Sequence, residues 1–138
     1  TSSWVVHTGY PLPATFLHRD LYPLKASGPY ALSKVLQEEL ARNYHEQHGM
    51  SIAVVRPSDI IDSQRMVRTD GKVVTDYSWG TIDRRDVASA LVCALEAKDI
   101  GYECFYLMAT PGGYKATDVA YTEERLGWRP EFTFDADF

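Results

Sequence analysis

The order of elements in residues 29–56, a long helix followed at once by a short apolar strand, constrains the fold more than any other part of the sequence. Pro29 suits the first turn of a helix, where its missing N–H has no helical partner to lose, and Gly49 stands where a helix ends. Between them, apolar side chains recur every four residues, at Leu32, Leu36, Leu40 and Tyr44. The β-branched run at 51–56 (SIAVVR) then predicts a buried strand.

A second helix and a second strand repeat this order further along the chain. Residues 83–97 are predicted to form a helix, because Asp83 can cap its first turn and an apolar stripe follows at Val87, Ala90, Leu91, Ala94 and Leu95. Residues 103–108 (ECFYLM) predict the next strand. Helix, strand, helix, strand implies right-handed crossovers and a parallel sheet. The sequence therefore predicts an α/β fold, in a single domain over residues 1–138.

The remaining segments are less regular. Residues 4–28 show no sustained periodicity, which is typical of a long connection that runs over a site. Residues 117–126 predict a short helix closed by Gly127, whereas Gly112 and Gly113 predict a turn. A sheet of two or three strands leaves an open edge and an apolar face. A partner is expected to cover them, so the chain is predicted to form a homodimer or a larger assembly.

Composition and charge exclude several classes of function. A net charge of −5, with 14 scattered lysines and arginines, argues against a nucleic-acid partner. No apolar run approaches 18 residues and no signal-like segment opens the chain, so we expect a cytoplasmic protein with no membrane contact. Cys93 and Cys104 have no ligand or CxxC spacing and are interpreted as buried free thiols. The histidines show no paired ligand spacing, so no metal is expected.

Tyr30 and Lys34 form the candidate chemical pair. Four residues apart on a helix, they share one face. A nearby ammonium favours the ionised form of a phenol, so such a pair can give and accept protons at neutral pH. On spacing alone, however, a surface helix can carry a tyrosine and a lysine by chance.

The pair stands within a series of short motifs, and the order of these motifs is more specific than any one of them. They are, in order, residues 1–3 (TSS), 28–34 (GPYALSK), 54–57 (VVRP), 86–88 (DVA) and 126–130 (LGWRP). This series resembles the extended short-chain dehydrogenase/reductase family, the NAD-dependent epimerases and dehydratases. The resemblance implies a partial Rossmann-like fold, the C-terminal half of a doubly wound parallel sheet with a small remnant of a substrate domain.

The resemblance also implies roles for individual residues. Ser3, with Ser2 as the alternative, would hydrogen-bond a substrate oxygen, and Tyr30 would be the general acid/base on that oxygen. Lys34 would hold the ribose of the nicotinamide and favour the tyrosinate form, and the cofactor-binding turn would include Pro57 and Ser58. The cofactor implied is NAD or NADP. For the two serines, the alternative is that they are loop hydroxyls bonded to nearby backbone groups.

Two departures from the family pattern change this expectation. The chain has no GxxGxxG loop for the pyrophosphate, so we expect it to correspond to the C-terminal half only and to bind little or no cofactor by itself. The interval from Pro57 to Asp86 is short, and Trp79-Gly80 stands where an Arg-Asp pair would be. A sugar acid or hydroxy-carbonyl substrate is therefore favoured over a nucleotide sugar, with four candidate partners for a carboxylate, at Arg65, Arg68, Arg84 and Arg85.

Two hypotheses for function remain open at this point. The first is the catalytic portion of an NAD(P)-dependent oxidoreductase, epimerase or dehydratase that acts on a sugar-like substrate. The second is a truncated domain without catalysis that serves as a homodimeric binding or interaction module.

Overall fold

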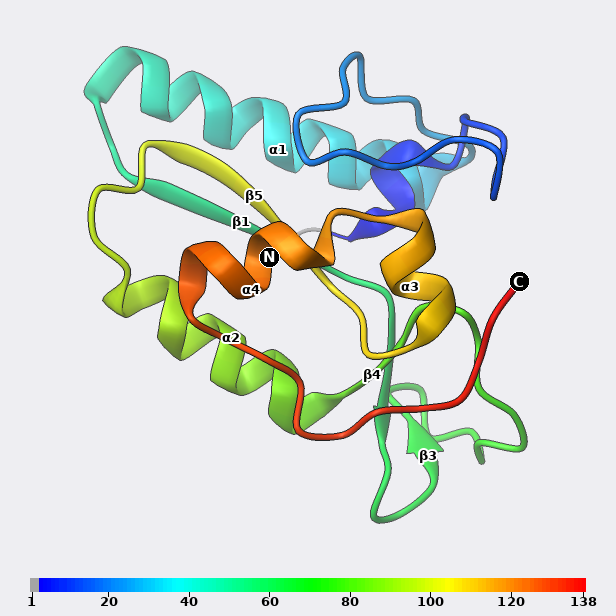
Figure 1. Ribbon diagram of the computed structural model, residues 1–138. Helices are drawn as coiled ribbons and strands as arrows, with labels where there is room; N and C mark the ends of the chain where they lie inside the picture. The colour runs from blue at the N-terminus through cyan, green and yellow to red at the C-terminus, as the bar shows by residue number, and fades with distance from the viewer. Residues whose placement is uncertain (1–2) are drawn as a thin grey trace.

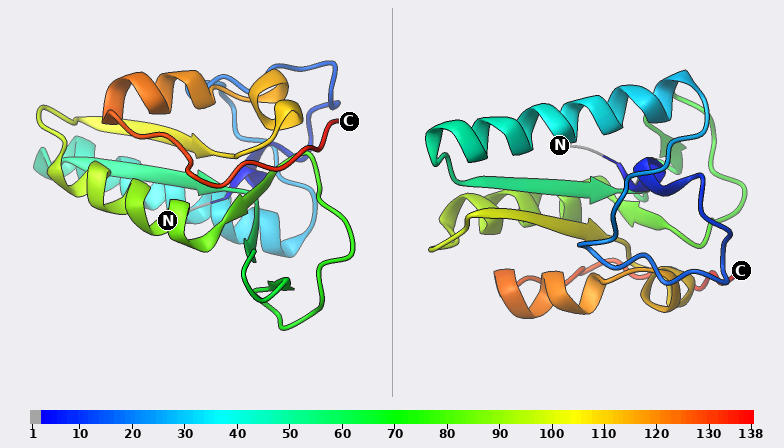
Figure 2. Two further views of the ribbon diagram at one scale, coloured as in Figure 1. Left: turned by 60° about the horizontal axis from the view of Figure 1, so that its bottom comes forward. Right: turned by 90° about the horizontal axis from the view of Figure 1, so that it is seen from above.

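The computed structural model describes residues 3–138, and its centre is a parallel pair of strands between helices (Figure 1). Strand β1 (Ile52–Pro57) pairs with β5 (Tyr102–Leu107) in register, from Ile52 opposite Tyr102 to Pro57 opposite Leu107. The long helix α1 (Pro29–His48) lies on one side of this pair and α2 (Arg84–Glu96) on the other (Figure 2). The predicted α/β fold, with a parallel sheet, is confirmed.

Alternation along β1 explains why a short strand can hold both helices. The side chain of Arg56 meets Glu38 of α1, whereas the neighbouring Val55 packs in the apolar core with Val87 and Ala90 of α2. Successive side chains of a strand point to opposite faces, so the six residues of β1 contribute to both layers. This arrangement fits the nearly continuous apolar run by which the sequence predicts a buried strand.

A second, smaller sheet follows β1 and is absent from the sequence-based prediction. Its order is β3 (Val67–Arg68), β2 (Asp59–Asp62) and β4 (Thr81–Asp83), with β2 antiparallel to β3 and parallel to β4. Its strands are too short to show a period in the sequence. Ile61 and Ile82 are fully buried and anchor this sheet in the main core.

Both long helices begin and end where the sequence predicts. Gly49 adopts a left-handed conformation, with φ of 64°, after α1, and its N–H donates to the carbonyl of His45. The Asp83 side chain accepts a hydrogen bond from the backbone N–H of Arg85 at the start of α2. Gly127 ends α4 (Val119–Leu126) in the same left-handed way, with φ of 61°.

The apolar stripe of α1 does not pack on the sheet. Its four members, Leu32, Leu36, Leu40 and Tyr44, are 47–61% exposed. The helix instead buries Ala31 and Glu38. The period of four correctly predicts the helix, but the face that it marks is open to solvent in the described chain.

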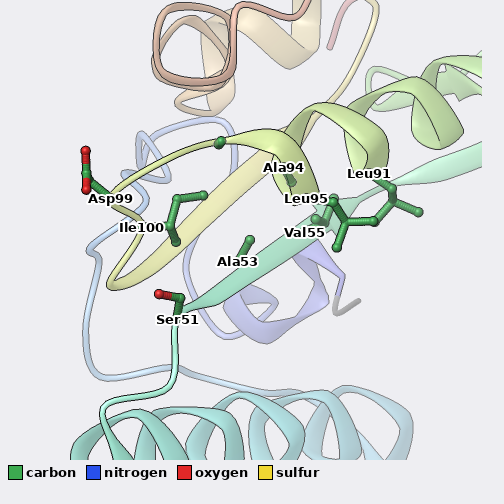
Figure 3. A pocket seen from close by; sticks show the side chains of 9 residues that line it. Ser51, Ala53, Val55, Leu91, Ala94, Leu95, Asp99 and Ile100 are labelled. Atoms are coloured by element: carbon green, nitrogen blue, oxygen red, sulfur yellow. The ribbon is translucent and has the colours of Figure 1, made fainter.

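The free edge of β1 also stays open, as expected for so small a sheet. Within residues 3–138, β1 pairs only with β5. An apolar cavity of about 270 Å³ runs along β1 and α2 (Figure 3), lined by Ser51, Ala53, Val55, Leu91, Ala94, Leu95, Ala97, Asp99 and Ile100. Leu95, which the sequence assigns to the buried stripe of α2, is 87% exposed.

The prediction of a turn at Gly112 and Gly113 is wrong, because both lie inside helix α3 (Pro111–Ala116). Thr110 caps this helix by accepting a hydrogen bond of 3.0 Å from the Gly113 N–H. A Cβ atom on Gly112 would lie 2.8 Å from the Cβ of Trp79, and one on Gly113 would lie 2.6 Å from that of Met108. These glycines therefore permit close packing of α3 on its neighbours.

The segment predicted as irregular begins with one turn of 3-10 helix, η1 (Trp4–His7), and is otherwise an extended loop. The loop is fixed at Leu17, which is fully buried and pairs with Thr117. At the other end, the chain after α4 returns to α2, where the buried Asp86 carboxylate accepts the backbone N–H groups of Glu131 and Phe132. The loop before α1 and the segment after α4 are thus both anchored to the core.

Candidate active site

Ser3 and the end of β1 are brought together by the fold. The Ser3 hydroxyl donates a hydrogen bond of 3.3 Å to the carbonyl of Pro57, the last residue of β1. Ser3 is buried and precedes η1, which packs against α1. Ser2, the alternative to Ser3, lies outside the described residues. The carboxyl ends of parallel strands are where α/β proteins bind ligands, and Ser3 and Pro57 both lie there.

Tyr30 and Lys34 share one exposed face of the first turns of α1. The Lys34 ammonium nitrogen lies 5.5 Å from the centroid of the Tyr30 ring and donates a hydrogen bond of 3.4 Å to the Gln37 side chain. Tyr30 is 62% exposed. Within residues 3–138, the Tyr30 hydroxyl has no hydrogen-bond partner, so it is open to a ligand, whereas the Lys34 ammonium is held by its long hydrogen bond to Gln37.

Ser58 lies directly against the segment that contains Trp79 and Gly80. A Cβ atom added to Gly80 would lie 2.3 Å from the Ser58 hydroxyl oxygen, so only glycine allows this approach. The Gly80 carbonyl accepts the N–H of Asp59 at 3.1 Å. The turn predicted to contact the cofactor is therefore held by a second strand, β4, whose start follows Gly80.

Aromatic side chains gather beside this turn. Trp4, next to Ser3, meets Trp79 edge to face with ring centroids 5.1 Å apart. Phe138 stacks on Trp79 with centroids 4.9 Å apart. The Trp79 carbonyl also accepts a hydrogen bond from the Thr110 hydroxyl. Three elements far apart in sequence thus meet at Trp79, next to Ser58.

A buried ion pair fixes α1 against β1 one turn beyond Lys34. Arg56 donates to both carboxylate oxygens of Glu38, at 3.0 and 2.7 Å, and both side chains are 1% exposed. Arg56 also donates to the Tyr106 hydroxyl and to the Arg19 carbonyl. Burial opposes the charge of Arg56, but the hydrogen bonds to Glu38, together with the electrostatic contributions of Tyr106, Cys104 and Glu38, outweigh burial and raise the pKa of Arg56. The pair positions the helix that carries Tyr30 and Lys34.

His7 is a buried histidine close to this ion pair. It is 0% exposed, and neither ring nitrogen has a hydrogen-bond partner among the described residues. Burial, and then the charge of Arg56, lower its pKa to about 3. His7 is therefore neutral at physiological pH and lies between the aromatic rings of Tyr10 and Tyr106.

The four arginines offered by the sequence for a substrate carboxylate are all paired with aspartates of the protein. Arg68 pairs with Asp59, and Arg85 binds Asp83 at 2.7 Å. Asp62 receives the other two, at 3.0 and 3.8 Å, from Arg84 and Arg65. Burial would raise the pKa of Asp83, but hydrogen bonds from Arg85 and Ser63 lower it far below its usual range. A substrate carboxylate would have to compete with these pairs.

The described residues contain neither a metal-binding cluster nor a membrane-spanning helix. Over residues 3–138, no cluster of three or more histidine, cysteine or acidic side chains is arranged to hold a metal ion. In the same range, no helix is both long and apolar enough to cross a bilayer. Cys93 and Cys104 are free thiols, as predicted, with Cys104 buried and Cys93 partly buried.

Sequence comparison now identifies the family. Residues 8–78 match the model of the NAD dependent epimerase/dehydratase family. The chain belongs to the NAD-dependent epimerase/dehydratase family. The matched range contains Tyr30, Lys34, Pro57 and Ser58 but begins after Ser3. No curated protein matches the chain.

Solved structures of similar fold include several enzymes. The chain resembles uronate dehydrogenase from Agrobacterium tumefaciens (TM-score 0.70, 21% identity) and glucuronic acid dehydrogenase from Chromohalobacter salexigens (TM-score 0.71, 20% identity), covering 96% of this chain and 46% of each of theirs. It also resembles UDP-glucuronic acid 4-epimerase from Bacillus cereus in complex with NAD (TM-score 0.71, 17% identity), covering 96% and 55%. At this identity the likeness establishes the fold, and the chain spans about half the length of these enzymes.

Sequence reasoning misses two parts of this candidate site. One is the contact of Trp4 with Trp79, in the segment that lies against Ser58, for which the only signal was that Trp79-Gly80 stands where an Arg-Asp pair would be. The pairing of Glu38 with Arg56 joins residues 18 positions apart on different elements. A buried charged residue in the strand run 51–56 was the available signal, because an arginine there needs a partner.

Proposed function

We propose that this chain is the catalytic portion of an NAD(P)-dependent dehydrogenase, epimerase or dehydratase that acts on a sugar acid or a related hydroxy-carbonyl compound. The observation that carries the proposal is the meeting of Ser3 and Pro57 at the carboxyl end of β1, next to the η1 turn. Helix α1, which carries Tyr30 and Lys34, is packed against the same turn. Family membership supports the proposal.

Tyr30 is proposed to move the proton. Tyr30 is 62% exposed and its hydroxyl has no hydrogen-bond partner within residues 3–138, so a substrate hydroxyl or carbonyl oxygen can take that position. The Lys34 ammonium nitrogen lies 5.5 Å from the centroid of the Tyr30 ring, on the same helical face. Ser3 would donate its hydroxyl hydrogen to the same substrate oxygen once it leaves the Pro57 carbonyl, to which its bond of 3.3 Å is long.

Part of an NAD(P) site fits the residues present. The hydrogen bond from Lys34 to Gln37 is long and exposed, which leaves the ammonium able to bind ribose hydroxyls. Pro57 and Ser58 would line the nicotinamide. NAD(P), when bound, would supply a hydride acceptor or donor. The pyrophosphate does not fit at Gly112 and Gly113, because that backbone is packed against Trp79 and Met108.

We propose that the pyrophosphate is bound by a glycine-rich half of the fold that residues 1–138 do not contain. The support is that the chain spans 46% of the uronate dehydrogenase. Binding of NADH to residues 1–138 alone is accordingly expected to be weak. A longer native form, if assayed, is expected to bind it tightly.

The proposed substrate class rests on two observations. Two of the similar structures are dehydrogenases of sugar acids. Trp4 follows Ser3, and Trp79 precedes Gly80, which lies against Ser58; aromatic side chains near this turn would suit the apolar side of a sugar ring. Asp62 pairs with both Arg65 and Arg84, and its single negative charge cannot neutralise both. The pair with Arg65 is the longer one, at 3.8 Å, and the Arg65 side chain is exposed. Arg65 is therefore the arginine most easily released to a substrate carboxylate.

The test is turnover of uronic acids with NAD⁺ or NADP⁺, using a form of the protein that binds the cofactor. Tyr30→Phe keeps the ring and removes the hydroxyl, and it should lower kcat by roughly 100-fold or more. Tyr44→Phe, on the same helix and 47% exposed, is the matched control and should leave kcat unchanged. Equal kcat values for wild type and Tyr30→Phe would remove Tyr30 from the mechanism.

A second candidate function is favoured by the exposed stripe of α1. Leu32, Leu36 and Leu40 present a continuous apolar face, which suits a homodimeric interaction module without catalysis. In that case Leu36→Lys would convert a dimer to a monomer in light scattering, and neither NADH binding nor turnover would be found in any form of the protein. Turnover that depends on Tyr30 would exclude the module as the sole function.

A further inference from the structure

A small cavity of about 120 Å³ lies on the side of the sheet that α1 covers, between the helix and the loop at residues 19–22. Arg42 and Arg56 line it with Tyr102 and Cys104 of β5. Arg42 is 12 residues after Tyr30 on the same helix, so at 1.5 Å per residue the two are roughly 18 Å apart. The cavity is thus separate from the proposed active site.

Arg42 differs from the other arginines of the described chain. Within residues 3–138, each of the other eight has a carboxylate within 4.0 Å: Arg19, Arg56, Arg65, Arg68, Arg84, Arg85, Arg125 and Arg129. Arg42 has no such partner in that range, and its buried Nε has no hydrogen-bond acceptor. Its guanidinium carbon lies 4.5 Å from the ring centroid of Tyr102 and 5.6 Å from that of Tyr22.

Stacking on two tyrosine rings holds the guanidinium in place without neutralising it. A buried N–H donor that lacks an acceptor is unfavourable, and a negatively charged group in the cavity, beside this guanidinium without a carboxylate partner, would be stabilising. The other two arginines that line the cavity, Arg19 and Arg56, already have carboxylate partners in Asp118 and Glu38. The one carboxylate in the lining, Asp20, is 70% exposed and lies 3.5 Å from Arg19.

The charge and the size of the cavity point to the same kind of ligand. Its volume corresponds to about four water molecules at roughly 30 Å³ each, which is room for one phosphate or carboxylate group. A planar guanidinium offers two parallel N–H donors to such a group. We propose that this cavity binds a small oxyanion, with Arg42 as its principal ligand. The proposal is independent of the proposed function.

Cys104 provides a readout, because it is one of the residues that line the cavity. The chain has two cysteines, so Cys93→Ser leaves Cys104 as the only thiol. The rate at which methyl methanethiosulfonate labels Cys104 is measured against inorganic phosphate in a low-salt buffer, with potassium chloride at matched ionic strength as the control. Phosphate is expected to slow labelling with a saturable dependence, and chloride is not. Acetate in place of phosphate tests whether a planar carboxylate binds as well.

Variants of the lining identify the ligand residue. Arg42→Met keeps the aliphatic stem and removes the charge, and it should raise the half-saturating phosphate concentration at least about tenfold. Arg129→Met removes an arginine that is paired with Glu123 outside the cavity, and it should leave this concentration unchanged. Asp20→Asn removes the carboxylate in the lining that competes with phosphate, and it should lower the half-saturating phosphate concentration.

Three results would overturn the proposal. They are no slowing by phosphate in the Cys93→Ser protein, equal slowing in Arg42→Met, and slowing by chloride to the same extent. If Arg42→Met fails to fold by circular dichroism, Asp20→Asn decides the matter. A half-saturating concentration that stays the same or rises in Asp20→Asn would then refute the proposal.

Discussion

Acidification from pH 7 to pH 5 is expected to destabilise the protein through His7. Burial, then the charge of Arg56, lower the pKa of His7 from 6.5 to about 3. The unfolded chain takes up a proton on this histidine at a higher pH than the folded protein does. The stability that the neutral histidine contributes is therefore present above the unfolded-state pKa and is lost as the pH falls toward the folded-state pKa. With these two values, the free energy of unfolding falls by about 2 kcal/mol between pH 7 and pH 5.

The replacement His7→Leu should remove this dependence. Neither ring nitrogen has a hydrogen-bond partner in the described chain, so the apolar side chain loses no hydrogen bond there. Unfolding in urea at pH 7, 6 and 5 gives the free energy of unfolding for both proteins. The difference between wild type and His7→Leu should change by about 2 kcal/mol over this range.

Two further measurements test whether His7 is a buried neutral side chain. His48→Leu, at an exposed position of the long helix, should show the same pH dependence as wild type. NMR titration of the His7 ring should show no protonation above pH 5 in the folded protein. If wild type and His7→Leu lose the same stability between pH 7 and pH 5, or if the His7 ring titrates near 6.5, then the assignment of His7 as a buried neutral side chain is refuted.

Three more predictions concern packing and charge. Glu38→Gln leaves the buried Arg56 without its carboxylate and should lower the free energy of unfolding by about 3–5 kcal/mol. Glu46→Gln, the same change at an exposed position of α1, should alter it by less than about 0.5 kcal/mol. Equal urea midpoints for the two variants would contradict this prediction. Gly113→Ala forces a Cβ toward Met108, at 2.6 Å, and should cost about 1–3 kcal/mol, so a variant as stable as wild type would show that α3 can move. The pKa of Asp83 is lowered in the fold, so the stability that the Asp83 carboxylate contributes is present above its unfolded pKa and is lost as the pH falls below about 4. Asp83→Asn should make the free energy of unfolding less sensitive to acid. An unchanged midpoint of acid unfolding would contradict this prediction.

Local signals predict the helices and the two central strands because each depends on residues close in sequence. Pro29 and Gly49 set the ends of α1 through constraints on their own backbone, and Asp83 caps α2 through a bond to a residue two positions away. The strand runs at 51–56 and 103–108 are nearly continuous apolar segments, which suits strands covered on both faces. The order of these elements is enough to predict a parallel pair.

Residues paired across the chain escape such reasoning. The small sheet β3-β2-β4 uses strands of two to four residues, whose pairing is set by tertiary contacts. The period of Leu32, Leu36 and Leu40 predicts a helix but says nothing of what covers that face, and in the structure it faces solvent. Gly112 and Gly113 were predicted to form a turn because the sequence does not distinguish a glycine required by a turn from one required by close packing of a helix.

The sequence by itself determined the order of elements, the helix ends and the pairing of Tyr30 with Lys34 on one helical face, because all of these follow from spacing along the chain. Only the tertiary structure decided that Ser3 meets Pro57, that Glu38 neutralises Arg56, and that His7 and Arg42 are left without partners in the described chain. Each of these depends on residues brought together from separate elements. The energetic consequences of these contacts depend on how deeply the polar groups are buried, and no local sequence pattern predicts that burial.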